Sequence, residues 1–335
     1  MRICVLGAGG LGSVVGGYLA QSGVDVVLIG RAAHVDQIRQ EGLRITGRRG
    51  EMCVSENLRA VTSAEDAEGC FDYLILLVKS KDTSSALAGA ASLRSRVKTV
   101  LSLQNELARA ERLQHWIEPS KVIGAVTVEG ATMIEPGHVS NHVTAATTAY
   151  FGELDGSESE RVEKLAETFT KAGLESLAVT NINQVTWEKL TYVASASSWS
   201  VSTLSAIPEL CLPDGLKIRE GAEHNVQITR ELLSVYKALG YMPQDFFAPF
   251  SRLKAIDSLS FDEAVQSMME IGANLESKNM RVRTSMHEDL LRGRKTESDE
   301  ILRPFLDKAA ELGLTIPTVS AVWRTMTVLN HYLND

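Results

Sequence analysis

Three glycines near the amino terminus have the spacing of a phosphate-binding loop. The chain reads GAGGLG from Gly7, so that Gly7, Gly9 and Gly12 form the pattern GxGxxG around Gly10 and Leu11. In this pattern the first glycine permits a tight turn, the second lets the backbone approach a pyrophosphate, and the third lets the following helix pack on the preceding strand. The phosphates then lie at the helix amino terminus, where N–H groups and the helix dipole favour negative charge. The pattern predicts a dinucleotide site; the alternative is a strand-to-helix turn that binds nothing.

A cation follows the next apolar run, at the place where the ribose of the dinucleotide is expected. Residues 26–29 are followed by Gly30 and Arg31. A carboxylate here would repel a 2′-phosphate, whereas a guanidinium holds one through paired hydrogen bonds. The absence of Asp or Glu at 30 and 31 therefore favours NADP, as NADPH, over NAD. The alternative is that Arg31 is a solvated loop residue.

Two further polar residues follow buried runs. Lys79 comes at the end of the run at 73–78, and Asn105 follows the run at 100–103. Because ligands of parallel sheets bind beyond the carboxyl ends of the strands, we expect Lys79, Asn105, Gly9 and Arg31 to converge on one rim. Lys79 and Asn105 also have simpler explanations. Lys79 could be a solvated residue after a strand, and Asn105 could cap the next helix.

The elements that must position these residues alternate between strand and helix in the first part of the chain. Short apolar runs without polar alternation are typical of strands buried on both faces of a parallel sheet. Such runs lie at 3–6, 26–29, 73–78 and 100–103, with further strands expected at 121–126, 150–154 and 174–180, a hairpin at 43–54, and helices at 34–41 and 157–172. The stretch 174–180 is expected to be the last strand of the sheet.

From about Asn183 onward the pattern changes, because helical periodicity dominates and strand-like runs disappear. The sequence therefore predicts an α/β fold in two domains. We expect residues 1–180 to form an NADP-binding, Rossmann-type doubly wound sheet and residues 181–335 to form an all-helical second domain.

The composition is that of an ordinary globular protein long enough for two domains, with 335 residues, 44% hydrophobic and 23% charged. A net charge of -8 argues against a nucleic-acid binder and against a basic membrane-surface protein. No apolar run is long enough to span a bilayer, and a strand beginning at residue 2 leaves no room for a signal peptide. Four scattered cysteines without a CxxC pair favour a reduced, cytoplasmic chain.

The chain resembles ketopantoate reductases (2-dehydropantoate 2-reductases) in a series of motifs that run in order to about residue 320. These are GAGGLGS, the arginine after the second strand, VKSKDT, LSLQNEL, EGATMIEPGHV, WEKL and RTSMHEDLLRGRKTE. The glycine pattern is shared by many dehydrogenases, whereas WEKL paired with TSMHEDLLRGRKTE in a helical domain is much more specific. The resemblance implies NADPH-dependent reduction of a 2-oxo acid, with pantoate formation as the type reaction. It also implies a site in the cleft between two domains, with residues 181–335 as a domain for substrate binding and dimerisation, and a homodimer formed through that helical domain.

The resemblance implies a role for five residues. Lys189 in WEKL matches the catalytic lysine of the family, and Glu297 matches a carboxylate that orients the lysine or holds substrate hydroxyls. Ser285 matches the serine that meets the substrate carboxylate, Asn105 lies near nicotinamide and substrate, and Lys79 lies at the cofactor rim. The role of Lys189 suits the chemistry, because hydride transfer to a ketone builds negative charge on oxygen that an ammonium can stabilise and protonate.

Two of these residues have alternative explanations in the sequence itself. Lys189 could be a surface lysine beside Glu188. Glu297 could pair with Arg292 or Arg294, which lie within one or two helical turns of it.

The chain also departs from the family pattern. Where the family commonly has asparagines four and eight residues beyond the lysine, this chain has Val193 and Ser197. The valine removes hydrogen-bonding capacity from the substrate site and leaves an apolar wall, which discriminates weakly between substrates. Leu302 and Arg303 replace a later Asn-Gly pair, and Glu106 replaces a glycine near the expected site. These changes indicate a different 2-oxo acid or carbonyl substrate, with Arg303 either a new anion contact or an exposed helix residue.

Two other functions are compatible with the sequence. The chain could be an NAD(P)-dependent dehydrogenase of the β-hydroxyacid or glycerol-phosphate type, although the TSM…TE segment argues against that. It could be a non-catalytic NADP-binding regulator, which the retained Lys189 argues against. His138 and His142 lack an evident third ligand, so no metal site is predicted. The serines at 195, 197 and 198 match no nucleophile motif and are interpreted as small residues that pack a helix or tune its polarity.

Overall fold

The computed structural model describes residues 1–335 except 106, 143–144, 250 and 335. The chain folds as two compact units, Met1–Thr186 and Trp187–Asp335, each of which has its own core. The division comes a few residues into helix α6 (Ile182–Thr203), whose first turn lies between the boundary expected at residue 180 and the observed one.

The first unit is built on a five-stranded, fully parallel sheet in the order β5-β2-β1-β6-β7. Its strands are β1 (Arg2–Leu6), β2 (Asp25–Ile29), β5 (Leu58–Val61), β6 (Phe71–Leu76) and β7 (Val97–Ser102). Alternate residues of β1 enter two different cores, Ile3 and Val5 on one face and Cys4 and Leu6 on the other. This explains why the run has no polar alternation and confirms the prediction of a sheet buried on both faces.

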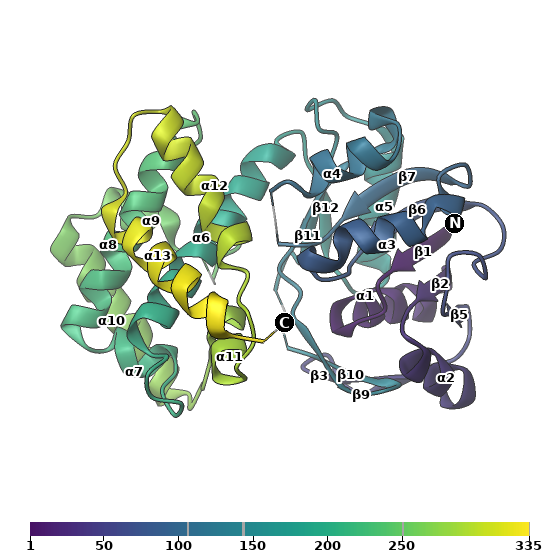
Figure 1. The fold of residues 1–335 in the computed structure, drawn as a ribbon, viewed down its shortest axis with the longest axis horizontal. Helices are drawn as coiled ribbons and strands as arrows, with labels where there is room; N and C mark the ends of the chain where they lie inside the picture. The colour runs from purple at the N-terminus through teal and green to yellow at the C-terminus, as the bar shows by residue number, and fades with distance from the viewer. Residues whose placement is uncertain (106, 143–144, 250, 335) are drawn as a thin grey trace. The chain divides into compact units, whose positions relative to one another are not determined.

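Helices cover both faces of this sheet (Figure 1). One core includes side chains of α1 (Gly10–Gln21), α2 (Ala32–Glu41) and α5 (Glu160–Lys171), and the other includes side chains of α3 (Thr83–Gly89) and α4 (Arg109–Trp116). The prediction of a doubly wound sheet is therefore confirmed. The sequence did not reveal β5, because its four residues include Arg59 and its run is too short to be distinctive.

Two smaller sheets complete the first unit. One has the order β4-β3-β10-β9 and consists of β3 (Leu43–Gly47), β4 (Met52–Val54), β9 (Ala131–Glu135) and β10 (His138–Asn141). The other has the order β12-β11-β8 and consists of β8 (Gly124–Thr127), β11 (Ala149–Gly152) and β12 (Ser176–Ala178). The expected hairpin at 43–54 is confirmed as the antiparallel pair β3 and β4.

The prediction that 174–180 adds the last strand to the parallel sheet was wrong. This stretch forms β12, which pairs with β11 in the separate three-stranded sheet, and β11 in turn pairs antiparallel with β8. An isolated bridge between Val100 and Val122 connects β7 to the segment that leads into β8. A short apolar run has the same pattern in either sheet, so the sequence could not distinguish the two arrangements.

Among the residues that the structure describes, the second unit consists of helices and the segments that join them, and it has no strand apart from one isolated bridge. It comprises most of α6, followed by α7 (Leu212–Leu216), α8 (Arg219–Ala238), α9 (Leu253–Ser258), α10 (Phe261–Ser277), α11 (Ser285–Leu291), α12 (Ser298–Glu311) and α13 (Pro317–Tyr332). Helix α8 packs against α7, α9, α10, α12 and α13. Ser260 and Glu263 form a capping box that begins α10.

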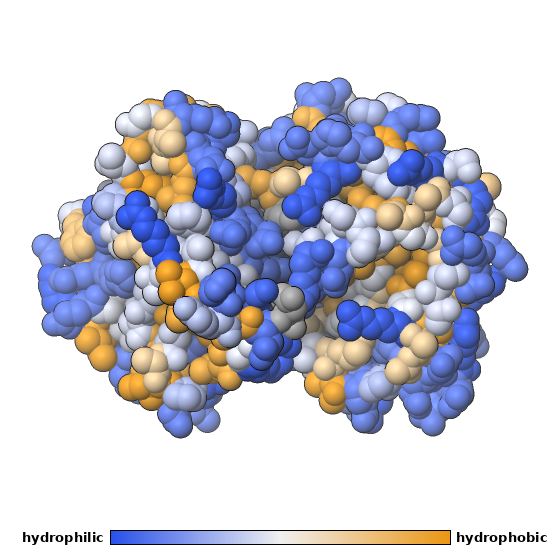
Figure 2. All heavy atoms as spheres, in the orientation of Figure 1, coloured by the Kyte–Doolittle hydropathy of each residue, from blue (hydrophilic) through white to orange (hydrophobic). Residues whose placement is uncertain are grey.

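Within the described residues, no helix combines the length and apolar character needed to cross a membrane. The face shown in Figure 2 is mostly hydrophilic, with hydrophobic residues in scattered groups.

Candidate cofactor and active-site residues

The glycine loop has the geometry that its three glycines were predicted to provide. Gly7 has φ +114°, and a Cβ on it would lie 2.5 Å from the backbone nitrogen of Val78. A Cβ on Gly12 would lie 2.1 Å from the carbonyl oxygen of Gly7, so no side chain fits between β1 and α1. A Cβ on Gly9, in contrast, would meet nothing within 4 Å. Gly7 and Gly12 are thus required by the fold, whereas Gly9 borders open space.

Gly10 and Leu11, the remaining members of the loop, face protein. A Cβ on Gly10 would lie 3.0 Å from the carbonyl oxygen of Ala131 and 3.0 Å from the backbone nitrogen of Met133, both in β9. Leu11 is half-buried and packs against the core of the first unit. Strand β9 therefore runs close beside Gly10 at the amino end of α1. The open space at this loop is next to Gly9.

The helices that follow β1 and β2 both begin without acidic side chains. The first turns of α1 and α2 contain no Asp or Glu. The first turns of α5, α8, α10 and α12 each contain at least one, whereas those of α3, α6, α9 and α13 also contain none. Since acidic residues stabilise a helix amino terminus, their absence from α1 and α2 leaves two positive helix ends available to an external anion. Arg31 adds a cation there, because it is the exposed N-cap residue of α2.

The structure brings the predicted residues of the first unit to one edge of the sheet. Gly7, Arg31, Lys79 and Asn105 follow the carboxyl ends of β1, β2, β6 and β7, which are neighbours in the sheet order. Lys79 is exposed and is the N-cap residue of a short 3-10 helix, Ser80–Asp82. Asn105 is exposed in the turn after β7. Glu106 lies outside the described residues.

Lys189 is not the surface lysine of the alternative interpretation. It lies on α6 in the second unit, and only 9% of its surface is exposed. Its neighbour Glu188 is fully buried, and its carboxylate accepts hydrogen bonds from the Tyr236 hydroxyl (3.0 Å) and from the backbone N–H groups of Gln244 (2.8 Å) and Phe246 (2.9 Å). Burial raises the pKa of Glu188, and these three donors oppose that change. Glu188 thus fixes α6 to the segment after α8.

Val193 and Ser197 follow Lys189 by one and two turns on the same face of α6. Val193 is half-buried and Ser197 is buried. The neighbouring serines at 195 and 198 are also buried, and the Ser195 hydroxyl lies 2.5 Å from that of Thr229 on α8. The burial of these serines agrees with small residues that pack around α6, and the role of Ser197 in the substrate site stays a prediction.

Ser285 is the exposed first residue of α11. Thr284 before it is the N-cap residue, whose hydroxyl accepts a hydrogen bond from the backbone N–H of His287. The Thr284 hydroxyl also lies 2.6 Å from the hydroxyl of Ser200 on α6. This contact fixes the start of α11 to the helix that carries Lys189.

Glu297 is a half-buried residue at the N-cap of α12. The arginines considered as its partners form ion pairs with other carboxylates, Arg292 with Glu288 at 3.3 Å and Arg294 with Asp289 at 2.5 Å. Nothing in the sequence separates these pairs from a pair with Glu297, because all three carboxylates lie within six residues of the arginines.

The segment that carries Glu297 is held by Asn330, a residue of α13 that the sequence did not single out. The Asn330 carbonyl oxygen accepts hydrogen bonds from the Thr296 N–H (2.9 Å) and hydroxyl (3.1 Å). Its amide donates to the Thr296 carbonyl (3.2 Å) and to the Ser298 hydroxyl (3.0 Å). One side chain thus grips the residues on both sides of Glu297. No periodicity or motif marks an asparagine near the end of the chain for this role.

His34 is a second residue that the sequence did not reveal. Its Nδ1 accepts a hydrogen bond from the Gly137 N–H (2.9 Å), so its Nε2 carries the proton and faces the Ser13 hydroxyl at 2.8 Å. The ring is buried, and burial lowers its pKa. Neutral His34 therefore joins α1, α2 and the turn between β9 and β10.

Two histidines and one arginine that the sequence singled out make contacts within their own unit. The His138 ring bonds the Thr46 hydroxyl (2.9 Å) and the His142 ring bonds the Thr132 hydroxyl (2.7 Å). Among the described residues, no group of three or more His, Cys, Asp or Glu side chains could hold a metal ion. Arg303 is exposed and pairs with Asp307 at 2.9 Å, as expected for an ordinary helix residue.

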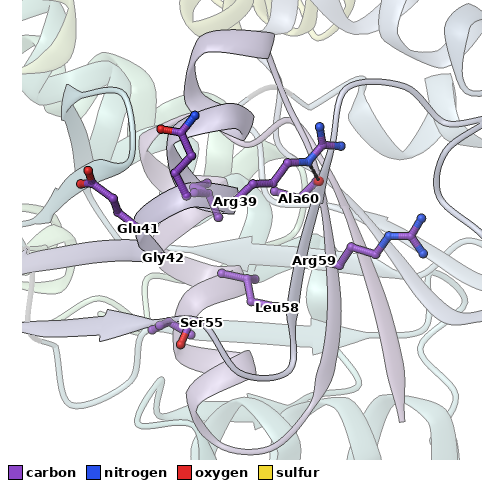
Figure 3. A pocket seen from close by; sticks show the side chains of 10 residues that line it. Arg39, Glu41, Gly42, Ser55, Leu58, Arg59 and Ala60 are labelled. Atoms are coloured by element: carbon purple, nitrogen blue, oxygen red, sulfur yellow. Dashed lines mark hydrogen bonds between the residues drawn. The ribbon is translucent and has the colours of Figure 1, made fainter.

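A groove of about 500 Å³ lies between the end of α2 and the segment that enters β5 (Figure 3). Arg39 crosses it and donates a hydrogen bond to the carbonyl of Ala60 (2.9 Å). Gly42 and Leu58 line the groove where α2 ends and β5 begins. The groove therefore lies at the opposite end of α2 from Arg31. The groove contains none of the predicted site residues.

The family model described as "Ketopantoate reductase PanE/ApbA" matches residues 3–156, and the model described as "Ketopantoate reductase PanE/ApbA C terminal" matches residues 181–330. The chain belongs to the ketopantoate reductase family. The 2-dehydropantoate 2-reductase of Pyrococcus horikoshii is 32% identical over 323 residues, which cover 96% of this chain and 95% of that protein. The resemblance inferred from the motifs is therefore confirmed, and the chain is a member of a family of oxidoreductases.

Two solved structures share the fold of this family member. The 2-dehydropantoate 2-reductase of Geobacter metallireducens matches with a TM-score of 0.80 at 23% identity, over 98% of this chain and 99% of that one. A ternary complex of D-mandelate dehydrogenase with NADH and anilino(oxo)acetate matches with a TM-score of 0.76 at 21% identity, over 99% of each chain. At these identities the likeness establishes the fold alone.

Proposed function

We propose that this member of the ketopantoate reductase family is an NADPH-dependent reductase of a 2-oxo acid, with Lys189 as the general acid. The observation that carries the proposal is the burial of Lys189, whose side chain exposes only 9% of its surface. Lysines are rarely buried this far unless a partner or a function requires it. Its motif WEKL resembles the one that carries the family's catalytic lysine, and this resemblance supports the same role for Lys189.

The residues at the edge of the sheet fit a dinucleotide. The open space beside Gly9, the acid-free starts of α1 and α2, and the exposed guanidinium of Arg31 together offer sites for a pyrophosphate and for a further phosphate. We assign the pyrophosphate to residues 9–12 and a 2′-phosphate to Arg31, with Lys79 and Asn105 along the rim. NADPH, when bound, supplies a hydride.

The residues of the second unit would perform the proton chemistry. The Lys189 ammonium would donate a hydrogen bond to the ketone oxygen, stabilise the negative charge that develops there, and deliver its proton to form the hydroxyl group. Ser285 would bind the substrate carboxylate, and Glu297 would orient Lys189 or accept a hydrogen bond from the substrate. Fixing α6, α11 and the Glu297 segment through Glu188, Thr284 and Asn330 would hold these groups in place before the substrate arrives.

Val193 and Ser197 point to the class of substrate. A half-buried valine one turn from the acid offers an apolar surface, and a buried serine offers little hydrogen-bonding capacity to a ligand. We therefore expect a 2-oxo acid whose side chain is apolar near this wall, rather than the hydroxylated side chain of 2-dehydropantoate. Because an apolar wall discriminates only weakly between similar substrates, we also expect the enzyme to accept several such acids.

A second candidate is an NADH-dependent dehydrogenase of a 2-hydroxy acid. It is favoured by Val193 and by the shared fold with D-mandelate dehydrogenase, which was solved with NADH. Arg31 argues for the phosphorylated cofactor instead. The two candidates differ in cofactor preference, so a comparison of NADPH with NADH separates them.

The test is a matrix of two cofactors against a panel of 2-oxo acids with apolar, aromatic and hydroxylated side chains. We expect NADPH oxidation to exceed NADH oxidation, with apolar acids preferred, and Arg31→Asp to weaken NADPH far more than NADH. Equal effects on the two cofactors would contradict the role of Arg31. Tight NADPH binding without turnover of any acid would instead support a non-catalytic regulator.

A further inference from the structure

The proposed function leaves Gln104 without a role, although it is a buried polar residue at the carboxyl edge of the parallel sheet. This edge, where the dinucleotide is proposed to bind, is called the cofactor edge below. Gln104 lies between the last residues of β7 and the exposed Asn105, and its own side chain is buried. Its amide nitrogen donates hydrogen bonds to the carbonyl of Val78 (2.8 Å) and to the hydroxyl of Thr83 (2.8 Å). Its carbonyl oxygen accepts a hydrogen bond from the Ser102 hydroxyl (2.8 Å).

These contacts join the carboxyl ends of two strands beyond their regular pairing. The ladder between β6 and β7 ends at Leu76 and Ser102, and one further backbone bond follows from Leu103 to Leu76. Val78, the residue before Lys79, lies beyond that ladder and is held by Gln104 instead. The Gln104 amide therefore links the segment that carries Lys79 to the segment that carries Asn105.

The same amide also reaches the glycine loop through Val78. The backbone nitrogen of Val78 lies 2.5 Å from where a Cβ of Gly7 would be, so the segment after β6 packs directly on the first glycine. A shift of Val78 would change both the wall beside Gly7 and the starting point of the Lys79 side chain. Gln104 thus connects the end of β7 to the phosphate loop at the end of β1.

The sheet order determines which part of a dinucleotide lies nearest to Gln104. The glycine loop follows β1, and Arg31 follows β2 on one side of it. The ends of β6 and β7 lie on the other side of β1. With the pyrophosphate at the loop and the ribose phosphate at Arg31, the nicotinamide half extends over the ends of β6 and β7.

We propose that Gln104 is a positioning residue for the nicotinamide half of the dinucleotide, acting through Val78 and Thr83. This inference rests on the proposed function. An amide is suited to the task because its nitrogen donates to the Val78 carbonyl while its oxygen accepts from Ser102, so a residue with only acceptors cannot replace it. Removing the amide leaves a buried carbonyl and a buried hydroxyl to find new partners, which moves the segment.

The test compares two ligands, NADPH and adenosine 2′,5′-bisphosphate, which carries the ribose phosphate but lacks the nicotinamide half. For Gln104→Leu we expect the Kd of NADPH to rise about tenfold, while that of the bisphosphate changes less than about twofold. Gln104→Glu has the same shape but no donor, and it should weaken NADPH at least as much. Thr83→Val removes one hydrogen bond only and serves as the mildest variant if the others fold poorly.

Tyr73→Phe is the matched control. It removes a single hydrogen bond of β6, from the Tyr73 hydroxyl to the Arg161 carbonyl (2.7 Å), away from the cofactor edge. It should leave both Kd values unchanged. Equal weakening of the two ligands by Gln104→Leu, or wild-type NADPH affinity in Gln104→Glu, would overturn the role of Gln104. Failure of the wild-type protein to bind NADPH, or of Arg31→Ala to weaken the bisphosphate, would overturn the proposed function and the role of Gln104 with it.

Discussion

The two units hold their candidate site residues in different ways. In the first unit the proposed site consists largely of backbone: a glycine loop, two helix amino termini and the ends of neighbouring parallel strands. In the second unit the proposed site residues are side chains on three helices, with Lys189 on α6, Ser285 on α11 and Glu297 at the start of α12. Lys189 and Glu297 are separated by more than one hundred residues of sequence.

This difference decides what a substitution does in each unit. A backbone site depends on the absence of side chains, so a single added methyl group can block it. A side-chain site depends on hydrogen bonds that hold its helices and segments, such as those from Glu188, Thr284 and Asn330. The four predictions that follow test this difference, in order of expected effect.

The largest effects are expected in the glycine loop, where two neighbouring positions should respond differently. Gly12→Ala places a Cβ 2.1 Å from the Gly7 carbonyl, so it should destabilise the first unit by about 1–3 kcal/mol or prevent its folding. Gly9→Ala has room for its Cβ, so it should fold normally and yet lose NADPH binding, because the methyl group occupies the space of the pyrophosphate. Thermal unfolding and NADPH titration measure the two effects, and normal NADPH affinity in Gly9→Ala would contradict the backbone site.

The second prediction concerns the side-chain site. Asn330→Ala removes four hydrogen bonds from the segment around Glu297 and should cost about 1–3 kcal/mol in denaturant unfolding. It should also lower kcat while leaving the Kd of NADPH unchanged, since the cofactor edge belongs to the other unit. The control is Thr327→Ala on the same helix, which removes only a bond to the Trp323 carbonyl and should change stability by less than about 0.5 kcal/mol. A kcat unchanged in both variants would remove the Glu297 segment from the site.

The contrast also explains how much the sequence could predict. The parallel sheet and its glycine loop were predictable, because a strand buried on both faces and a turn without side chains leave local patterns. The placement of 174–180 was not, because its pairing with β11 depends on a partner about 25 residues away in the chain. Lys189 and Glu297 were found only through motifs of a known family. Asn330, His34 and the hydrogen bonds of Gln104 were not found, since a polar residue that holds a distant segment looks like any other polar residue.

The third prediction uses pH to compare buried histidines in the two units. Burial lowers the pKa of His34 in the first unit, and burial together with Arg283 lowers that of His287 in the second. Each group therefore contributes stability above its ordinary pKa of 6.5, and that stability is lost as the pH falls through the window below 6.5.

The measurement is the midpoint of thermal unfolding across this window for the wild-type protein and His34→Asn. Asparagine can place its oxygen near the position of Nδ1 and accept the Gly137 N–H, but it does not titrate. The variant should therefore lose less stability on acidification than the wild type. Identical pH profiles would show that His34 makes no contribution to the acid lability.

The smallest effect is expected at Arg303, where the sequence left an anion contact open. Its ion pair with Asp307 is exposed, and its guanidinium lies 5.1 Å from the centre of the Trp323 ring. Arg303→Ala should change stability by about 0.5 kcal/mol or less, with the KM for the 2-oxo acid unchanged. A raised KM would restore Arg303 as a substrate contact.

The central claim is that the buried ammonium of Lys189 protonates the product of hydride transfer, and Lys189→Ala tests it most directly. With NADPH and the best 2-oxo acid found, we predict that kcat falls about 10²–10⁴-fold while the Kd of NADPH stays within about twofold of the wild type. Turnover close to that of the wild-type protein would contradict the account.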